Sequence, residues 1–219
     1  MPDRSPCGRG RTPRVPYRAL AAALFPLSLA CGGSDSTSVA RWQRLVQSPD
    51  AALMSVSGTS AEDVWMVGAS DADGPLVLHY DGSEWQREPT SNIAADLWWV
   101  HALPGGVAFM SGSDASVLVR RPGGIERLPT PGLGAHVVFG VWAAAEDDVY
   151  AVGSAHGRNG FLWHYDGRAV AELPLPAELP LDANGDAPGF FKVWGRSSSD
   201  VWVVGDRGVV LRGNAQSGF

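Results

Sequence analysis

Three oxygen-bearing side chains in one loop have the spacing of a metal-binding segment. Asp182, Asn184 and Asp186 stand at alternate positions, as do the first oxygen ligands of a calcium loop. Such a loop has glycine at its sixth position and glutamate at its twelfth, whereas this chain has Ala187 and Val193 there. Calcium binding by the three residues is therefore one prediction, and a surface loop braced by prolines is the alternative.

Acidic residues also recur at one position of a repeated pattern, just after a loop and before an apolar strand: Asp63, Asp148 and Asp200. Equivalent positions of successive repeats lie far apart, so we do not expect these carboxylates to share a catalytic pocket. Each is predicted to accept backbone N–H bonds in its own turn. The aromatic residues two positions later are predicted to fill the gap between adjacent sheets; they are Trp65, Phe109, Tyr150 and Trp202.

The histidines and the glycine motifs do not indicate catalysis. His79 and His164 occupy matching places in the repeats, which indicates a packing or cross-strand role. The other three histidines, His101, His136 and His156, lack the spacing of a zinc site. The chain also has neither a Gly-x-Ser-x-Gly elbow nor a phosphate-binding loop. We therefore predict no enzymatic activity and no cofactor.

Four segments of the chain align with one another without gaps over their central part. They are Val56–Gly68, Val100–Gly112, Val141–Gly153 and Val193–Gly205, at offsets of 44, 41 and 52 residues. Periods of this size are typical of propeller blades, and 27 glycines and 16 prolines suit many short strands joined by tight turns. The sequence predicts an all-β, propeller-like fold of about four blades, with units near 52–90, 97–130, 137–172 and 190–214 in a domain covering 42–219.

The repeated residues Trp-Gly-x-x-x-x-Asp-Val-Trp-x-Val-Gly, followed by His-Tyr-Asp-Gly-Ser-x-Trp, resemble the repeats of propeller lipoproteins from myxobacteria and related bacteria. The resemblance covers residues 42–214 and implies architecture more than activity. The second unit departs from the pattern, with Val107 in place of the aspartate and Phe109 in place of the tryptophan. We expect that blade to be looser or differently turned.

The N-terminal region has the features of an export signal and a lipid anchor. Residues 1–30 combine five arginines with the apolar stretch Ala19–Leu29, which is too short to span a bilayer. Leu27-Ser28-Leu29-Ala30-Cys31 resembles the lipobox of bacterial lipoproteins, which implies lipidation of Cys31. An ordinary signal peptide with an incidental cysteine is the alternative. Residues 31–41 are predicted to form a flexible tether. Through the lipid on Cys31 the domain is expected in the cell envelope, at the outer membrane or the cell surface.

The two ends of the repeat region suggest a way to close a ring. Trp42-Gln43-Arg44 matches Trp85-Gln86-Arg87, the fourth strand of the first unit, and the last unit has no such strand. An N-terminal strand could complete the last blade and hide both sheet edges. The alternatives are a closed four-bladed ring and a partial propeller, left as an open arc or assembling with a second copy.

Charge narrows the choice of partners. Without residues 1–30 the chain has 12 basic and 22 acidic residues, and such a surface repels phosphate backbones, so nucleic acid is not an expected partner. We predict a lipid-anchored binding or scaffolding module without catalytic activity, whose ligand is a protein or a glycan. The alternatives are an exported carbohydrate-active enzyme, such as a glycosidase or lyase, and a helper in envelope protein assembly.

Overall fold

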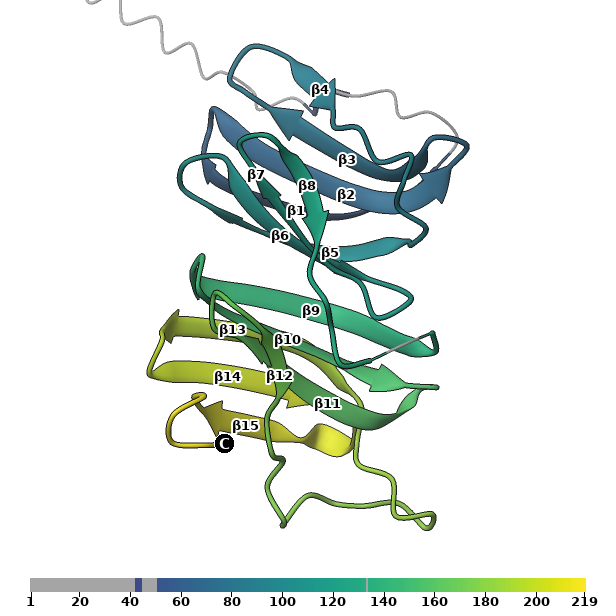
Figure 1. Cartoon of the computed structure of the whole chain (residues 1–219), viewed down its shortest axis with the longest axis vertical. Coiled ribbons are helices and arrows are strands. Elements are labelled where there is room, and N and C mark those ends of the chain that lie inside the picture. Colours follow the sequence, from purple (N-terminus) through teal and green to yellow (C-terminus); the bar gives the residue numbers. More distant parts are fainter. Residues whose placement is uncertain (1–41, 45–50, 133) are drawn as a thin grey trace, which may run out of the picture. The chain divides into compact units, whose positions relative to one another are not determined.

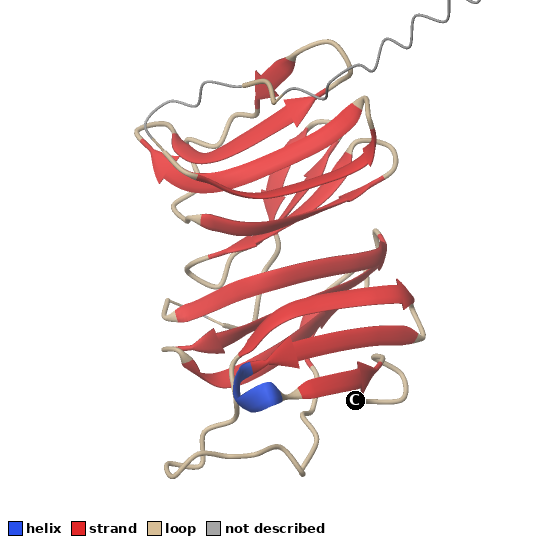
Figure 2. Ribbon diagram, turned by 180° about the vertical axis from the view of Figure 1, so that it is seen from behind, coloured by secondary structure: helices blue, strands red, loops and turns tan. Residues whose placement is uncertain are grey.

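The computed structural model describes residues 42–44, 51–132 and 134–219, which form fifteen strands and one short 3₁₀ helix (Figures 1 and 2). Contacts divide the chain into the units Met1–Gln43 and Arg44–Phe219, and every strand belongs to the second unit. The strands form four antiparallel sheets in chain order, which we call sheets 1 to 4. The expected all-β class is confirmed.

Sheets 1 to 3 have four strands each, and sheet 4 has three. Sheet 1 contains β1 (Leu53–Ser60), β2 (Asp63–Asp71), β3 (Gly74–Tyr80) and β4 (Trp85–Arg87). Sheet 2 contains β5 (Leu97–Leu103), β6 (Val107–Gly112), β7 (Val117–Arg121) and β8 (Gly124–Arg127). Sheet 3 contains β9 (His136–Ala145), β10 (Asp148–Ala155), β11 (Arg158–Tyr165) and β12 (Val170–Glu172). Sheet 4 contains β13 (Phe190–Ser197), β14 (Asp200–Gly205) and β15 (Val210–Gly213), with the 3₁₀ helix Asp206–Gly208 before β15.

Local sequence explains the hairpins within these sheets. Asp81 and Gly82 follow β3, where Gly82 has a φ of 94° that suits a residue without a Cβ. The Asp81 carboxylate accepts hydrogen bonds from the backbone N–H groups of Glu84 and Ser83 and from the Ser83 hydroxyl. These bonds lower the pKa of Asp81 to about 2, and the bond from Glu84 has the largest effect on it. Gly167 repeats the conformation after β11, with a φ of 85°.

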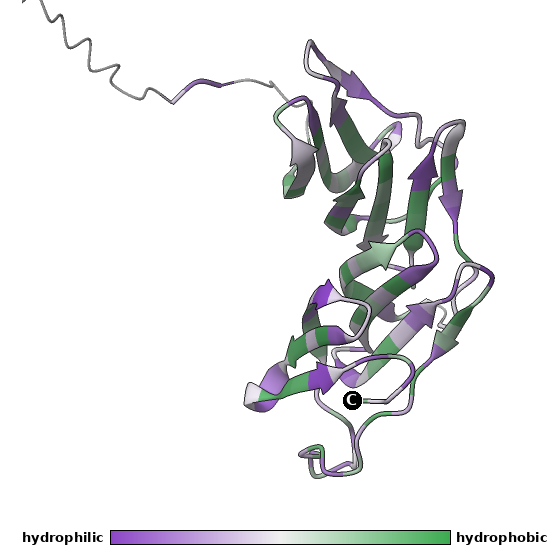
Figure 3. Cartoon of the chain, turned by 90° about the vertical axis from the view of Figure 1, so that its left-hand side faces the viewer, coloured by the Kyte–Doolittle hydropathy of each residue, from purple (hydrophilic) through white to green (hydrophobic). Residues whose placement is uncertain are grey.

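Successive sheets pack face to face. β1 and β2 contact β5, β5 and β6 contact β9, and β9 and β10 contact β13. Three clusters of buried apolar side chains fill these three interfaces. The strands that form the interfaces are predominantly hydrophobic (Figure 3). We call the face of a sheet that points to the next sheet its forward face, and the face that points to the preceding sheet its rear face.

The four sheets are not closed into a ring. Trp42, Gln43 and Arg44 have no strand assignment, and sheet 4 consists of β13, β14 and β15 alone. The predicted closure by an N-terminal strand is therefore wrong in the part of the chain that the structure describes, and the partial propeller is the form observed. Pairing with a neighbouring strand needs matching backbone positions, which a three-residue sequence match does not supply.

The aromatic position of the repeat is buried in three sheets and exposed in the fourth. Trp65, Phe109 and Tyr150 are fully buried, whereas Trp202 is 37% exposed. The expectation that Trp202 lies between two sheets is wrong, because its side chain is on the forward face of sheet 4 and no following sheet covers it. Sheet 2 is not looser than its neighbours, since Phe109 and Val107 are both buried in a four-stranded sheet. Its first hairpin is turned differently, as expected, because β5 and β6 lack the register shift that the other three sheets have beside this turn.

Candidate binding groove at the inner strands

The first strand of each sheet lies at a sheet edge, and these four inner strands border a common groove. A hollow of about 290 Å³ is lined by residues from all four of them. They are Val56 and Ser57 of β1, Trp99, Val100 and His101 of β5, Val141 and Trp142 of β9, and Lys192, Val193 and Trp194 of β13. The groove thus brings together residues nearly 140 positions apart in the sequence.

Lys192 reaches across this groove from sheet 4 to sheet 2. Its ammonium nitrogen lies 3.7 Å from the ring centroid of Trp99 and donates a 2.9 Å hydrogen bond to the carbonyl oxygen of Phe139. Gly140 makes room for this, because a Cβ there would lie only 3.2 Å from the Lys192 Cα. Burial lowers the pKa of Lys192, while the ring and the carbonyl stabilise the charge.

Side chains of the first two inner strands bond to the backbone of the next one. The hydroxyl oxygens of Ser55 and Ser57 accept bonds from the N–H groups of Val100 and Ala102. His101 forms a 3.1 Å bond between its Nε2 and the Ala143 carbonyl oxygen, so that Nε2 is the donor. Burial lowers the pKa of His101, and the bond to Ala143 offsets part of this effect. The histidine is therefore neutral at pH 7 and links two sheets.

Aromatic rings extend the groove surface around Lys192. Phe139 makes edge contacts with both Trp98 and Phe191, at centroid distances of 6.3 and 5.8 Å. Phe191 and Trp194 are exposed to solvent. The groove therefore offers flat apolar surfaces beside an ammonium group, a combination that binds apolar side chains together with a negative group.

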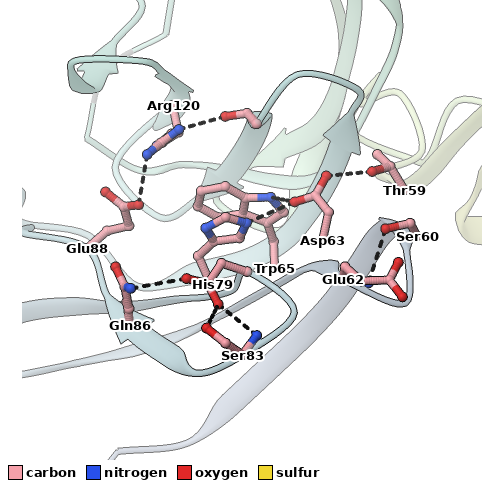
Figure 4. A network of polar contacts seen from close by, with 12 residues as sticks. Thr59, Ser60, Glu62, Asp63, Trp65, His79, Ser83, Gln86, Glu88 and Arg120 are labelled. Carbon is pink, nitrogen blue, oxygen red and sulfur yellow. Dashed lines mark hydrogen bonds and ion pairs between the residues drawn. The ribbon is translucent and has the colours of Figure 1, made fainter.

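The repeated aspartates form a different kind of cluster, shown for sheet 1 in Figure 4. Asp63 accepts hydrogen bonds of 3.0 Å from the Trp65 indole and 2.9 Å from His79 Nε2, and a third from the Thr59 hydroxyl. The His79 ring stacks on Trp65 at a centroid distance of 3.9 Å. Burial acts to raise the pKa of Asp63, but the hydrogen bonds from Thr59, His79 and Trp65 outweigh it and hold the pKa below its usual range.

The same cluster recurs in sheets 3 and 4. Asp148 bonds to His164 at 2.8 Å, and Asp200 accepts bonds from the Trp202 indole at 3.1 Å and from Arg212 at 2.7 Å. The expected cross-strand role of the histidines agrees with these contacts. The partners of the carboxylates differ from the expectation, since they are side chains of the same sheet rather than backbone groups of the turn. The clusters stiffen these three sheets, because they tie the start of the second strand to the third strand.

The loop with calcium-like spacing holds its carboxylates by other bonds. Asp182 accepts hydrogen bonds from the backbone N–H groups of Asn184 and Asp186, at 2.8 and 3.0 Å. Arg207 lies 3.7 Å from the Asp182 carboxylate, and Arg158 lies 3.7 Å from that of Asp186. Among the described residues no group of three or more histidine, cysteine or acidic side chains is placed to hold a metal ion. Calcium binding by Asp182, Asn184 and Asp186 stays a prediction.

The predicted lipidation site, Cys31, lies outside the described residues, as do the rest of the signal segment and the tether. Within the described part of the chain, no helix has the length and apolar character needed to cross a membrane.

Comparisons with known proteins bear on the fold. Neither the family models nor the curated proteins searched include a match to this chain. Among solved structures, the computationally designed protein Ika4 is 16% identical, with 78% of this chain and 98% of Ika4 covered and a TM-score of 0.52. This chain has a propeller-like fold. Two structures of YCF48 are also similar, one bound to a D1 peptide (18% identity, 81% and 67% coverage, TM-score 0.46) and one from Cyanidioschyzon merolae (12%, 80% and 99%, 0.23). At such identities the likeness concerns the fold alone.

The groove residues were not among the candidates that the sequence suggested. Trp99 and Lys192 stand one place before the aligned valine of their repeats, and His101, Trp142 and Trp194 stand one place after it. Trp142 and Trp194 open the repeated pattern, but the residue types at these two positions change from one repeat to the next. The available signal was that the first strands of the second and fourth units carry large or charged residues on both sides of the aligned valine. That signal identifies a surface only once the inner strands are known to converge.

Proposed function

We propose that this protein is an exported, lipid-anchored module that binds an extended segment of another polypeptide in its inner-strand groove. The observation that carries the proposal is the position of Lys192 over Trp99, with Trp142 and Trp194 lining the same hollow. Three consecutive sheets contribute these side chains, so the site depends on the whole stack rather than on one blade.

A polypeptide segment suits this chemistry well. The tryptophan rings provide surfaces for apolar or aromatic side chains, and a lysine ammonium has three N–H donors, of which the Phe139 carbonyl takes one. A carboxylate of the ligand is a suitable partner for another. The inner strands also lie at sheet edges, where an extended chain finds backbone donors and acceptors. We therefore favour an acidic peptide with apolar residues on either side of its carboxylate.

The titratable groups of the groove support binding rather than chemistry. His101 Nε2 donates a hydrogen bond to the Ala143 carbonyl oxygen. The Lys192 ammonium donates one to the Phe139 carbonyl oxygen and lies over the Trp99 ring. Both side chains therefore hold neighbouring sheets in place. A module of this kind presents a preformed surface, which reduces the entropy lost on binding.

Peptide binding is tested with the full chain and two variants. A displayed library of random peptides is selected on the parent, and the enriched peptides are measured against Lys192→Met and against Leu181→Ala, an exposed apolar residue outside the groove. We expect acidic, aromatic-rich peptides whose affinity falls about tenfold in Lys192→Met, equal to about 1.4 kcal/mol, and is unchanged in Leu181→Ala. Binding on a glycan array without any peptide binding would contradict the proposal.

The lipid anchor rests on the sequence around Cys31 and on the resemblance to propeller lipoproteins. Two acyl chains on one N-terminal cysteine would hold the protein firmly at a membrane. Cys31→Ser is expected to move the protein from the membrane fraction to the soluble fraction, measured by fractionation of the producing cells. Retention of the variant at the membrane to the same extent as the parent would overturn the anchor.

A further inference from the structure

Among the described residues, no sheet covers the forward face of sheet 4 or the rear face of sheet 1, whereas the other sheet faces pack on a neighbouring sheet. The forward face of sheet 4 exposes Trp194, Trp202, Val204 and Val210. The rear face of sheet 1 exposes Met54 and Val56, and hollows of about 420 and 600 Å³ lie over it, both lined by Met66. The remaining forward and rear faces are buried in the three apolar clusters.

The rear face of sheet 1 has the same residues as a face that is buried inside the chain. In sheet 2, Val100 pairs with Met110 and Met110 with Leu118, and all three are buried against sheet 1. In sheet 1 the same register positions hold Val56, Met66 and Leu78. Leu78 is buried and Met66 is half-buried, so the exposed part of this face lies at β1. Val56 is 62% exposed, although its counterpart Val100 is covered. The rear face of sheet 1 is thus built to receive a forward face.

The forward face of sheet 4 likewise repeats a covered one. Trp142 of sheet 3 pairs with Tyr150, and Trp194 of sheet 4 pairs with Trp202 in the same register. Trp142 packs on Gly195 so closely that a Cβ there would lie 2.5 Å from the indole ring. Trp194 has no such glycine opposite it and is 60% exposed.

The glycine that matches Trp194 is present at the other end of the stack. Gly195 pairs with Val201 in sheet 4, and Gly58 pairs with Val64 at the equivalent position of sheet 1. Gly58 is exposed on the rear face. At the interface of sheets 3 and 4, a tryptophan on a forward face thus packs on a glycine on a rear face. The forward face of sheet 4 has the equivalent tryptophan, and the rear face of sheet 1 has the equivalent glycine.

Charge also matches between the two free faces. Arg212 lies on the forward face of sheet 4 over the Trp202 ring, and its side chain is exposed. Glu84 lines the larger hollow on the rear face of sheet 1. Arg212 also bonds to Asp200 of its own sheet at 2.7 Å. Inside the chain an arginine and a glutamate likewise pair between neighbouring sheets, with the faces exchanged: Arg120 of sheet 2 lies over the Trp65 ring and bonds to Glu88 of sheet 1 at 3.2 Å.

We propose that the forward face of sheet 4 binds the rear face of sheet 1 in a second copy of this chain, and that two such contacts close a ring of eight sheets. Trp194 of each copy then packs on Gly58 of the other. Two copies are proposed because propellers have four to eight blades, so that eight sheets is the upper end of that range and three copies would exceed it. A head-to-tail contact that closes after two steps yields a two-fold symmetric dimer.

The test uses the full chain in mild detergent and native mass spectrometry, which counts chains in each particle. Val204→Asp places a charge on the forward face of sheet 4, and Val56→Asp does so on the rear face of sheet 1. Both residues are exposed, so neither change disturbs the core. Leu181→Asp, on an exposed residue outside both faces, is the control. We expect dimers for the parent and the control, and monomers for each of the two face variants.

Mixing the two face variants distinguishes this contact from any other. A Val204→Asp copy retains an intact sheet 1, and a Val56→Asp copy retains an intact sheet 4, so that the mixture can form one unaltered contact. We expect mixed dimers at higher protein concentration than the parent needs. A monomeric parent, a dimer that survives either variant, a mixture that stays monomeric, or assemblies of more than two chains would each overturn the proposal.

Discussion

The aspartate clusters of the first and last sheets have nearly the same chemistry but different surroundings. In sheet 1, Asp63 binds the indole of Trp65 and a cross-strand His79, and in sheet 4, Asp200 binds the indole of Trp202 and a cross-strand Arg212. Trp65 is fully buried, whereas Trp202 is 37% exposed. The comparison shows that the repeat specifies the cluster, while the next sheet along the stack decides whether the cluster lies in a core.

The largest difference between the two regions is expected for the tryptophans themselves. Trp65→Ala should lower the free energy of unfolding by about 3 to 5 kcal/mol, because it leaves a cavity between sheets 1 and 2. Trp202→Ala should lower it by about 1 kcal/mol, since its ring already contacts water. Urea midpoints measure both, in a Val56→Asp background that prevents the proposed contact between copies. Equal losses would show that Trp202 lies in a core after all.

The tight contact at Gly195 should have the next largest effect. Gly195→Ala places a methyl group against the Trp142 ring, and overpacking of this kind costs about 1 to 3 kcal/mol. The double variant Trp142→Ala with Gly195→Ala removes the clash, so its loss should be smaller than the two single losses combined. Thermal or urea unfolding of the four proteins gives the coupling. Strict additivity would mean that the two residues do not press on each other.

The Asp63 carboxylate is expected to make stability depend on pH. In the folded protein the pKa of this carboxyl lies below its usual value of 3.8. Its contribution to the free energy of unfolding is therefore fully present above pH 3.8 and is lost as the pH falls through the lowered pKa. Asp63→Asn should cost about 1 to 2 kcal/mol at pH 7, and the variant should lose less stability than the parent on acidification. Urea midpoints between pH 7 and pH 2 measure this. Parallel curves would assign the acid sensitivity to other groups.

The equivalent substitution in sheet 4, Asp200→Asn, should cause a smaller loss of stability, and this loss should depend on salt. The hydrogen bond from Arg212 is the main cause of the lowered pKa of Asp200, and the Arg212 side chain is exposed. Solvent and salt weaken such pairs, so Asp200→Asn should lower the urea midpoint less than Asp63→Asn does. The cost should shrink further in 1 M salt, whereas that of Asp63→Asn should not. Urea unfolding at both salt concentrations is the measurement.

The smallest effect is expected in the insertion before sheet 4. Asp182 accepts two backbone hydrogen bonds within its own loop and lies outside the three apolar clusters. Asp182→Ala should therefore leave the urea midpoint of unfolding nearly unchanged. A loss as large as that of Trp65→Ala would show that this loop supports the stack.

Much of the fold could be predicted because its signals are local. The alternation of Asp63-Val64-Trp65-Met66-Val67 indicates a strand with two different faces, and Asp81-Gly82 indicates the hairpin that follows the next strand. Recurrence of these signals at offsets of 41 to 52 residues indicates blades. The candidate site could not be predicted in this way, because Lys192 and Trp99 belong to different sheets and meet only after sheets 2, 3 and 4 have stacked.

The sequence by itself determined the repeat, the strands and turns within each unit, and the aromatic position that faces the following sheet. Short-range periodicity and turn chemistry are sufficient for these features. Only the tertiary structure decided that the four sheets form an open arc, that Trp202 is uncovered, and that Lys192 crosses to Trp99 above Gly140. The physical reason is that burial and convergence depend on how each sheet is placed against its neighbour, and a local pattern is the same whether or not a neighbour is present.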